Sequence, residues 1–430
     1  MKQSTSIKVK TIINVSLLSL SSLCYAQKSS VVTFKNELAT EKKNELIVLK
    51  RAFLEAKLGK VPVSKYVIFA NENKQPILAQ YDDLNGDGKW DEIALLQSFV
   101  ANQVKSFKIS VSDRPATIKA LVRANVRHRR KNADDTFGDI LDKDAVKGTQ
   151  PATDFSKQPL PPFLTEGPAW ENDKVGFRVY FDTRNAKDIW GKTTSQMVLN
   201  EVGLDTANNY HKQADWGMDV LKVGKSLGAG SLALTFKNAS GKDTLVRLGD
   251  NNFEEVQYVK ISNGPLRAVF KLKYKNWKIA KHLAPVQVEE VISIWGGQYF
   301  YESSVSLKNA PKGAVLTTGI VNLHSKNSFE IASNKITGLY TYDQQSENHD
   351  NLGMAIVVPK SSLISFGQTP NSGTGILNTY TVNLKLINGK TSFRFYAGWE
   401  KSEEFFKNKE GFEEFLKQEM KLMESPLNLK

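Results

Sequence analysis

The segment from Trp170 to Arg184 carries residue types that bind anions and move protons. It reads WENDKVGFRVYFDTR, and from Val175 onward apolar and polar residues alternate, as is typical of a β-strand. The apolar set, which would enter a core, is Val175, Phe177, Val179 and Phe181. The other face would present a cation, a phenol and a carboxylate: Arg178, Tyr180 and Asp182. That face is either a solvated surface with a cross-strand ion pair or a platform for a substrate.

A second group of reactive side chains lies in Tyr210–Lys222, which reads YHKQADWGMDVLK. Little in it is periodic, so we expect a loop. Among the five histidines of the chain, His211 has the neighbours best suited to proton transfer. An unperturbed imidazole titrates near neutrality, whereas a phenol does not. A lone histidine is more often structural, and that alternative stays open.

The strongest local motif is Asp83–Glu92, DLNGDGKWDE. Acidic or amide side chains occupy positions 1, 3, 5 and 9 of the loop and glycine occupies position 6, as in the first part of an EF-hand calcium loop. Position 12, normally glutamate, is Ala94. Asn-Gly and Asp-Gly also favour plain hairpin turns. The candidate residues for a structural Ca²⁺ site are Asp83, Asn85, Asp87, Lys89 and Asp91; we expect no organic cofactor.

The elements that must position these groups are mostly strands. Period-two runs between 65 and 112 predict a small N-terminal β-sandwich (27–115), preceded by a helix over 41–58. The polar, basic stretch 116–162 is predicted to be a connecting segment. Ten or more strand patterns from 163 to about 400, without alternating helices, indicate a large antiparallel β-supersandwich. An amphipathic pattern over 403–423 predicts a helix inside this last domain, 163–430.

The first 26 residues resemble a cleavable export signal, with Lys2, Lys8 and Lys10 before an apolar stretch. The alternative is a lipoprotein signal, with Cys24 lipidated. Cleavage would leave no cysteine, and would reduce the net charge from +13 to +10, because three lysines are removed (13 − 3). No later run is long and apolar enough for a transmembrane helix. An exported, basic protein suits a periplasmic location and an anionic polysaccharide partner better than nucleic acid; we expect a monomer.

Four runs together resemble a known family. They are YDDLNGDGKWDE, GPAWENDKVGFRVYFDTRNAKDIWGK, YHKQADWGMDVLKVGKSLGAG and NGPLRAVFKLKY. The sequence is similar over most of its length to exported Bacteroidetes proteins, formerly a domain of unknown function, that include the ulvan oligosaccharide dehydratase. The resemblance implies a fold similar to the galactose-mutarotase class. It also implies removal of water from a terminal glucuronic or iduronic acid linked to sulfated rhamnose, which gives a 4,5-unsaturated uronyl end.

That chemistry needs a cation on the uronate carboxylate, a base for the C5 proton and an acid for the 4-hydroxyl. We predict that Arg178 binds the carboxylate and that His211 and Tyr180 transfer protons, with Tyr210 as an alternative base. The candidate substrate-binding residues are Glu171, Arg184, Asp215, Trp216, Asp219, Lys222 and, in a basic run, His128.

Two other functions fit the same residues. A non-catalytic carbohydrate-binding protein would use the same aromatic and basic side chains. A glycoside hydrolase would need two carboxylates about 5–9 Å apart, which the acidic residues near Tyr180 and His211 could supply. Ultraviolet absorbance from an unsaturated uronate, without shortening of the oligosaccharide, would distinguish the dehydratase from both.

Overall fold

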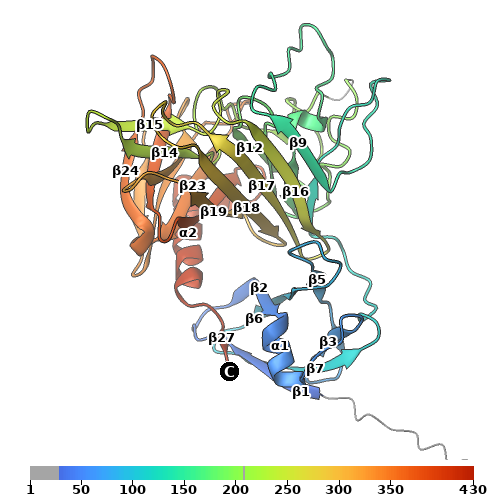
Figure 1. Cartoon of the computed structure of the whole chain (residues 1–430). Coiled ribbons are helices and arrows are strands. Elements are labelled where there is room, and N and C mark those ends of the chain that lie inside the picture. Colours follow the sequence, from blue (N-terminus) through green and yellow to red (C-terminus); the bar gives the residue numbers. More distant parts are fainter. Residues whose placement is uncertain (1–28, 207–208) are drawn as a thin grey trace, which may run out of the picture.

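The first period-two segments form a small domain of two sheets (Figure 1). The computed structural model describes residues 29–206 and 209–430, so the expected signal segment lies outside the described residues. One sheet has the order β27-β1-β7-β3-β4 and the other β2-β6-β5. The bounds are β1 (Ser29–Lys35), β2 (Lys42–Lys50), α1 (Arg51–Leu58), β3 (Tyr66–Ala70), β4 (Pro76–Ile77), β5 (Gln80–Asp82), β6 (Glu92–Phe99), β7 (Val104–Ser112) and, at the C-terminus, β27 (Asn428–Leu429).

Only the second part of the predicted helix over 41–58 is helical. Its first part is β2, which pairs with β6, and α1 begins at Arg51. Pairing with β6 lets Ile47 and Leu49 enter the core of the small domain, and this tertiary contact outweighs the helical pattern of the segment.

The large domain is an antiparallel sandwich. A nine-stranded sheet, β21-β22-β23-β26-β19-β18-β17-β16-β9, packs against two five-stranded sheets, β13-β12-β11-β10-β8 and β15-β14-β20-β25-β24, through one shared core. The bounds are β8 (Ala124–Arg127), β9 (Lys143–Lys147), β10 (Ala169–Asn172), β11 (Val175–Val179), β12 (Lys187–Lys192), β13 (Gly217–Asp219), β14 (Ala233–Lys237), β15 (Asp243–Arg247), β16 (Glu255–Asn263), β17 (Arg267–Trp277), β18 (Val286–Trp295), β19 (Phe300–Lys308), β20 (Val315–Val321), β21 (Phe329–Ala332), β22 (Ile336–Asp343), β23 (Leu352–Pro359), β24 (Leu363–Gln368), β25 (Thr379–Lys385) and β26 (Lys390–Trp399).

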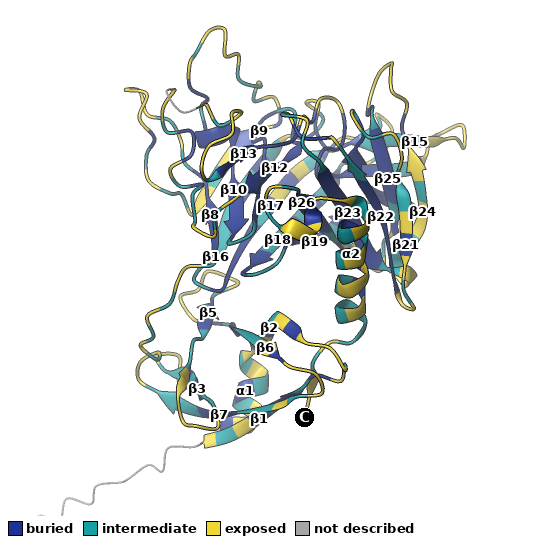
Figure 2. Cartoon of the chain, turned by 180° about the vertical axis from the view of Figure 1, so that it is seen from behind, coloured by how far each residue is buried: buried dark blue, intermediate teal, exposed yellow. Residues whose placement is uncertain are grey.

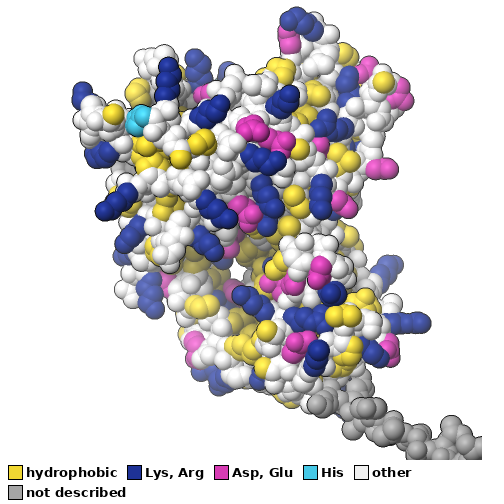
Figure 3. Space-filling view, viewed as in Figure 1, with side chains coloured by type: hydrophobic (Ala, Val, Ile, Leu, Met, Phe, Trp, Pro, Cys, Tyr) yellow, Lys and Arg dark blue, Asp and Glu magenta, His cyan; other side chains and the backbone are white. Residues whose placement is uncertain are grey.

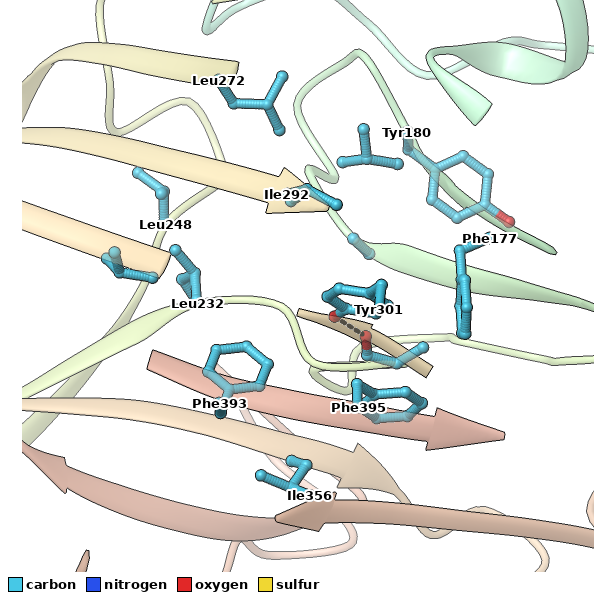
Figure 4. Packing of buried hydrophobic residues seen from close by; sticks show 14 of the residues in the cluster. Phe177, Tyr180, Leu232, Leu248, Leu272, Ile292, Tyr301, Ile356, Phe393 and Phe395 are labelled. Atoms are coloured by element: carbon cyan, nitrogen blue, oxygen red, sulfur yellow. Dashed lines mark hydrogen bonds between the residues drawn. The ribbon is translucent and has the colours of Figure 1, made fainter. Parts of the chain in front are cut away.

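Aromatic rings join the sheets inside the sandwich. Phe177 of β11 lies 4.9 Å from Tyr301 of β19, and Tyr301 stacks on Phe395 of β26 at 5.8 Å (Figure 4). The predicted inward set of β11 is therefore in the core, and the register of that strand is as expected. Tyr180 lies at the edge of this cluster, with its hydroxyl pointing away from it (Figure 4).

The predicted C-terminal helix is present as α2 (Lys409–Glu424), but it begins at Lys409 and not at residue 403, because a separate 3₁₀ turn, Glu404–Phe406, precedes it. The side chain of Asn408 caps its first turn by accepting the N–H of Gly411. Phe412, Leu416 and Met420 pack against the outer side of the nine-stranded sheet, and the opposite side of the helix is exposed (Figure 2). An all-β fold with a small N-terminal sandwich, a large antiparallel sandwich and a C-terminal helix is thus confirmed.

The segment 116–162 is more than a connection. It supplies β8, which pairs with β10, and β9, which pairs with β16, so both strands belong to the large domain. The C-terminal end of the chain returns to the small domain, where β27 pairs with β1. No helix of the described ranges 29–206 and 209–430 is long and apolar enough to cross a membrane.

Candidate active site

Strand register gathers polar side chains on the outer face of the sheet that contains β11. Arg178 lies directly opposite Asp188 of β12, and Trp190, two residues further on the same face, lies opposite Asp219 of β13. Tyr180 follows Arg178 by two residues and shares its face. The loop side chains Val198, Leu199, Val202, Tyr210 and Trp216 pack around Trp190 on this face, and Arg178, Asp188 and Asp219 are all buried.

Arg178 is the centre of the cluster. Its Nη2 donates to Asp219 Oδ2 at 2.5 Å, to Asp188 Oδ2 at 2.8 Å and to the Tyr180 hydroxyl at 2.7 Å. The Tyr180 hydroxyl in turn donates to Asp188 Oδ2 at 2.8 Å. Glu166 approaches from the other side, with Oε2 3.8 Å from Nη1. One guanidinium therefore faces three carboxylates.

This imbalance favours retention of a proton. Burial raises the pKa of Asp219 well above its usual value, and the neighbouring charge of Asp188 adds to the effect, although Arg178 opposes it. Asp219 Oδ1 has no hydrogen-bond partner in the part of the chain that the structure describes. Burial also raises the pKa of Tyr180, which stays a phenol. We infer that Asp219 is the carboxyl that holds the proton.

Glu166 is held in a strained turn. Thr165 and Glu166 have φ values of 46° and 66°, in the left-handed region that non-glycine residues seldom adopt. The buried Arg127 fixes this turn by donating to the carbonyls of Leu164 and Gly167 and to the Thr165 hydroxyl. The strained turn thus directs a third carboxylate, that of Glu166, toward the cluster.

Arg184 closes the cluster on the solvent side. It donates to Glu166 at 2.6 Å and to Asp182 at 2.5 Å, and its guanidinium stacks on the Tyr180 ring at 3.8 Å from the centroid. One third of its side chain is exposed. It is the cation of this group that an anionic ligand can approach.

His211 and Tyr210 connect the cluster to solvent. The Nδ1 atom of His211 is 3.5 Å from Asp219 Oδ2, and 48% of the His211 side chain is exposed. Partial burial and the charge of Arg178 lower the pKa of His211, so its imidazole is neutral at pH 7 and can accept a proton. Burial raises the pKa of Tyr210 to about 12. Tyr210 also lines a cavity of about 610 Å³, together with Trp216 and Lys212.

The structure brings six predicted residues together. Four are the predicted catalytic residues Arg178, Tyr180, Tyr210 and His211, and two, Arg184 and Asp219, come from the predicted substrate-binding set. The prediction that Arg178 touches the substrate carboxylate is wrong for this conformation, because its side chain is fully buried and its donors are occupied. Asp182 does not contact Arg178 either. It follows the end of β11 by three residues, where the chain turns, and pairs with Arg184 instead.

The predicted substrate-binding residues divide into two sets. Asp215 and Lys222 are exposed, and Trp216 packs on Trp190 at 6.0 Å. The structure contradicts the prediction for Asp219, Glu171 and His128, whose side chains are buried. Asp219 is 1% exposed and accepts from Arg178, so it does not face a ligand. Glu171 is fully buried in a pair with Lys192 at 2.5 Å, and His128 is fully buried beside Asp144 at 2.7 Å. Their carboxylate and imidazole are used inside the sandwich and are not available to a ligand.

Sequence reasoning missed Glu166, Asp188 and Trp190. Asp188 and Trp190 lie on the strand that follows the Asp182–Asn185 turn, so pairing the two strands as a hairpin would have placed them beside Arg178. The signal for Glu166 is weaker, since no residue type marks its unusual backbone.

The Asp83–Glu92 loop lies between β5 and β6, and its side chains organise it. The Asp83 carboxylate accepts N–H bonds from Gly86 and Gly88, both at 2.7 Å, and Asp91 accepts from Leu84 at 2.8 Å. Across residues 29–206 and 209–430, no group of three or more His, Cys, Asp or Glu side chains is arranged to hold a metal. Calcium binding would also need amide and main-chain oxygens, and it stays a prediction.

Comparison with known proteins gives a relative in sequence and similar solved structures. "Uncharacterized protein P7" of Formosa agariphila is 23% identical over 436 residues, which span 96% of this chain and 97% of that protein. An α-mannosidase of Enterococcus faecalis aligns with a TM-score of 0.47 and 10% identity, over 94% of this chain and 46% of that one. A glycosyl hydrolase family 38 protein of Enterococcus faecalis gives 0.46 and 10%, over 94% and 48%. The chain thus spans about half the length of these two structures.

The family comparison covers nearly the whole described chain. Residues 34–429 match the family described as "Domain of unknown function (DUF4861)". This range includes both domains and every residue of the Arg178 cluster, and the chain belongs to the DUF4861 family.

Proposed function

We propose that the chain is an oligosaccharide dehydratase. It would remove water from the uronic acid at the non-reducing end of ulvan oligosaccharides, a glucuronic or iduronic acid linked to sulfated rhamnose, in the periplasm. The observation that carries the proposal is the half-exposed His211 beside Asp219, with Tyr210 and Tyr180 on the same guanidinium. The resemblance of the four sequence runs to the dehydratase family supplies the substrate class.

The elimination balances with these groups. Neutral His211 takes the C5 proton, the C5–H electron pair becomes the C4=C5 double bond, and the C4–O bond breaks. The 4-hydroxyl leaves as water after protonation by a phenol, for which Tyr210 and Tyr180 are candidates because their raised pKa values keep them protonated. Arg184 is the accessible cation for the uronate carboxylate, and Lys212 and Lys222 are exposed nearby for sulfate.

The buried cluster would act indirectly. Once His211 gains a proton it is a cation next to Asp219, and a carboxylate there stabilises it. Asp219, which holds a proton in the free protein, would have to release it into the cluster to become that carboxylate. Arg178 is therefore a positioning residue in this proposal, which aims Tyr180 and fixes the carboxylates.

The cluster geometry disfavours a glycoside hydrolase. A hydrolase places two carboxyl groups about 5–9.5 Å apart on either side of the scissile bond. Here Asp188 and Asp219 share one guanidinium nitrogen and are 1% exposed, so a sugar ring cannot lie between them.

His211→Ala tests the proposal directly. With ulvan oligosaccharides that carry a saturated uronate end, we expect the appearance of ultraviolet absorbance to slow by about 10²–10⁴-fold, because one general base is lost. His282→Ala, at an exposed histidine outside the cluster, is the matched control. Activity near that of the unmodified protein in a folded His211→Ala variant would contradict the proposal.

The pH profile gives a second test of the same role. Because the pKa of His211 is lowered, the acid limb of kcat/KM should lie below pH 6.5, and the rate should be flat from there to neutrality. An acid limb above pH 7 would assign the base to another group.

We also propose that Ca²⁺ binds the Asp83–Glu92 loop in a structural role, with Asp83, Asn85, Asp87 and Asp91 and the main-chain carbonyl of Lys89 as its partners. EDTA should lower the melting temperature by a few degrees, on the order of 1 kcal/mol, and added Ca²⁺ should restore it. Asp83→Asn should remove the response to EDTA. A melting temperature that EDTA leaves unchanged would indicate a plain turn held by its own hydrogen bonds.

A further inference from the structure

One outer face of the nine-stranded sheet carries a dense array of lysines. Cross-strand pairing lines up the outward side chains of β9, β16, β17, β18, β19 and β26 in three rows that run across the strands, and these rows form the face. We call it the lysine face. Its cations are Lys143, Lys147, Lys271, Lys273, Lys275, Lys308 and Lys390, and its carboxylates are Glu255 and Glu289. Seven cations against two anions give a formal charge of +5 (7 − 2).

Most of this charge is not neutralised locally. Lys271 pairs with Glu289 at 3.2 Å, and Lys275 pairs with Glu255 at 2.7 Å. Among the described residues, the remaining five lysines have no carboxylate within 4.0 Å, and all five are exposed. Alternate residues of one strand are roughly 7 Å apart and neighbouring strands about 5 Å apart, so these like charges repel one another. An anion bound across the rows would relieve that repulsion.

The lysine face is open to a large ligand. The helix α2 packs on the other half of the sheet, over β22 and β23. Figure 3 shows Lys and Arg side chains gathered on this side of the molecule, above a hollow that separates the two domains. The hollow is a cavity of about 770 Å³, and Val291 and Ser304 of the nearest row line it together with Arg394. The face and the hollow form one continuous surface.

The chemistry between the lysines suits a carbohydrate chain. Hydroxyl and amide groups lie on the same rows, from Gln257, Gln287, Ser304, Ser306 and Ser392. None of the described side chains of these rows is aromatic, so nucleic acid bases find no ring to stack on. The apolar members are small, Ala145, Val259 and Val291, and offer no anchor for insertion into lipid.

We propose that the lysine face is an accessory, non-catalytic surface that binds an anionic polysaccharide chain, with sulfate esters as the groups that the lysines recognise. It lies on the opposite side of the sandwich from the Arg178 cluster, which is on the outer face of the β10–β13 sheet. The proposal does not rest on the proposed dehydratase activity, because a surface of this kind holds the polymer whether or not the protein modifies its ends.

Binding of dextran sulfate, with uncharged dextran as the matched polymer, tests the proposal. The probe is not a substrate, so the result is independent of catalysis. We expect the full-length protein to bind dextran sulfate and not dextran, measured by affinity gel electrophoresis and titration calorimetry. The variant is the triple substitution Lys143→Gln, Lys147→Gln and Lys273→Gln, which removes three unpaired, exposed lysines without touching the core.

The triple variant should bind dextran sulfate at least about 10-fold more weakly at low salt. The slope of log K against log salt concentration should fall by about two to three, because each lysine–anion contact releases counterions. A control triple with the same charge loss on the small domain, Lys60→Gln, Lys74→Gln and Lys108→Gln, should bind as the unmodified protein does. Polygalacturonate, a carboxylate polymer without sulfate, should bind more weakly than dextran sulfate.

Three results would overturn the proposal. The first is unchanged binding by the lysine-face variant. The second is an equal loss in the control triple, which would mean that only overall charge attracts the polymer. The third is equally tight, equally lysine-dependent binding of duplex DNA or of vesicles rich in anionic lipid, which would assign the face to another class of partner.

Discussion

Two buried charge groups lie on neighbouring strands of the same sheet, and they differ in balance. Lys192 of β12 and Glu171 of β10 form a one-to-one pair with both side chains fully buried. Glu171 also accepts the N–H of Leu199 at 2.8 Å, and Lys192 donates to the carbonyls of Asn172 and Gln196 at 2.7 Å. Arg178, on the strand between them, instead faces three carboxylates, of which two contact the same nitrogen.

The difference separates a structural pair from a candidate catalytic group. In the Lys192–Glu171 pair each charge has its counter-charge and its hydrogen bonds. Around Arg178 two carboxylates contact one guanidinium nitrogen, and burial raises the pKa of one of them, Asp219, well above its usual value. Only this second group extends to solvent, through His211. A buried ion pair is weak evidence of function by itself, and unequal charge with a path to solvent is better evidence.

The largest effect should follow removal of the shared cation. Arg178→Met leaves Asp188 and Asp219 buried without their partner, whereas Glu166 keeps its pair with Arg184, and we expect a loss of about 5 kcal/mol in unfolding free energy at pH 7. The loss should shrink at pH 5, because the abandoned carboxyls can take up protons. Urea unfolding at both pH values measures it.

The control for that substitution is Arg114→Met, at an exposed arginine, which should change stability by less than about 0.5 kcal/mol. If Arg178→Met were as destabilising at pH 5 as at pH 7, loss of packing and not unpaired charge would be the cause.

Breaking the Lys192–Glu171 pair should lower the unfolding free energy by less, and a second substitution should restore part of the loss. Lys192→Met leaves one buried carboxylate, Glu171, and should cost about 3 kcal/mol. Adding Glu171→Gln should recover part of this loss, because an amide costs less to bury than an unpaired charge and still accepts the Leu199 N–H. Chemical denaturation of the two single variants and the double variant gives the coupling between the residues. Additive losses would show that the two side chains do not act as a pair.

Sequence periodicity predicted the strands better than their surroundings. Alternation along 175–181 predicted that Phe177 enters the core and that Arg178 and Tyr180 share the opposite face of the strand. The structure agrees. It could not predict that Arg178 is buried, because the side chains that pack over it, among them Leu199, Val202 and Tyr210, follow no periodic pattern. Nor could it predict Asp188 as the partner, since that depends on cross-strand register. His128 and Glu171 show the same limit, because a polar residue type does not reveal whether its partner lies inside the fold.

The smallest expected effect concerns the proton itself. The pKa of Asp219 is raised in the folded protein, so the folded state binds a proton more tightly than the unfolded chain does. The stability that this proton contributes is fully present below about pH 3.8 and is lost as pH rises through the folded pKa. Asp219→Asn keeps the shape and cannot titrate. Its unfolding free energy should therefore vary less between pH 5 and 8 than that of the parent, with a difference on the order of 1 kcal/mol across this range.

His211 titrates in the same range and must be removed from the comparison. The lowered pKa of His211 acts in the opposite direction. As pH falls below about 6.5, the unfolded chain binds a proton on this imidazole more readily than the folded protein does, so stability is lost. Urea unfolding at pH 5, 6, 7 and 8 should therefore compare His211→Gln with the double variant His211→Gln, Asp219→Asn. A flatter pH dependence in the double variant places the proton on Asp219. If the unfolding free energies of the two variants depended on pH identically, Asp219 would not hold the proton. The distinction between the Arg178 cluster and the Lys192–Glu171 pair would then lose its support.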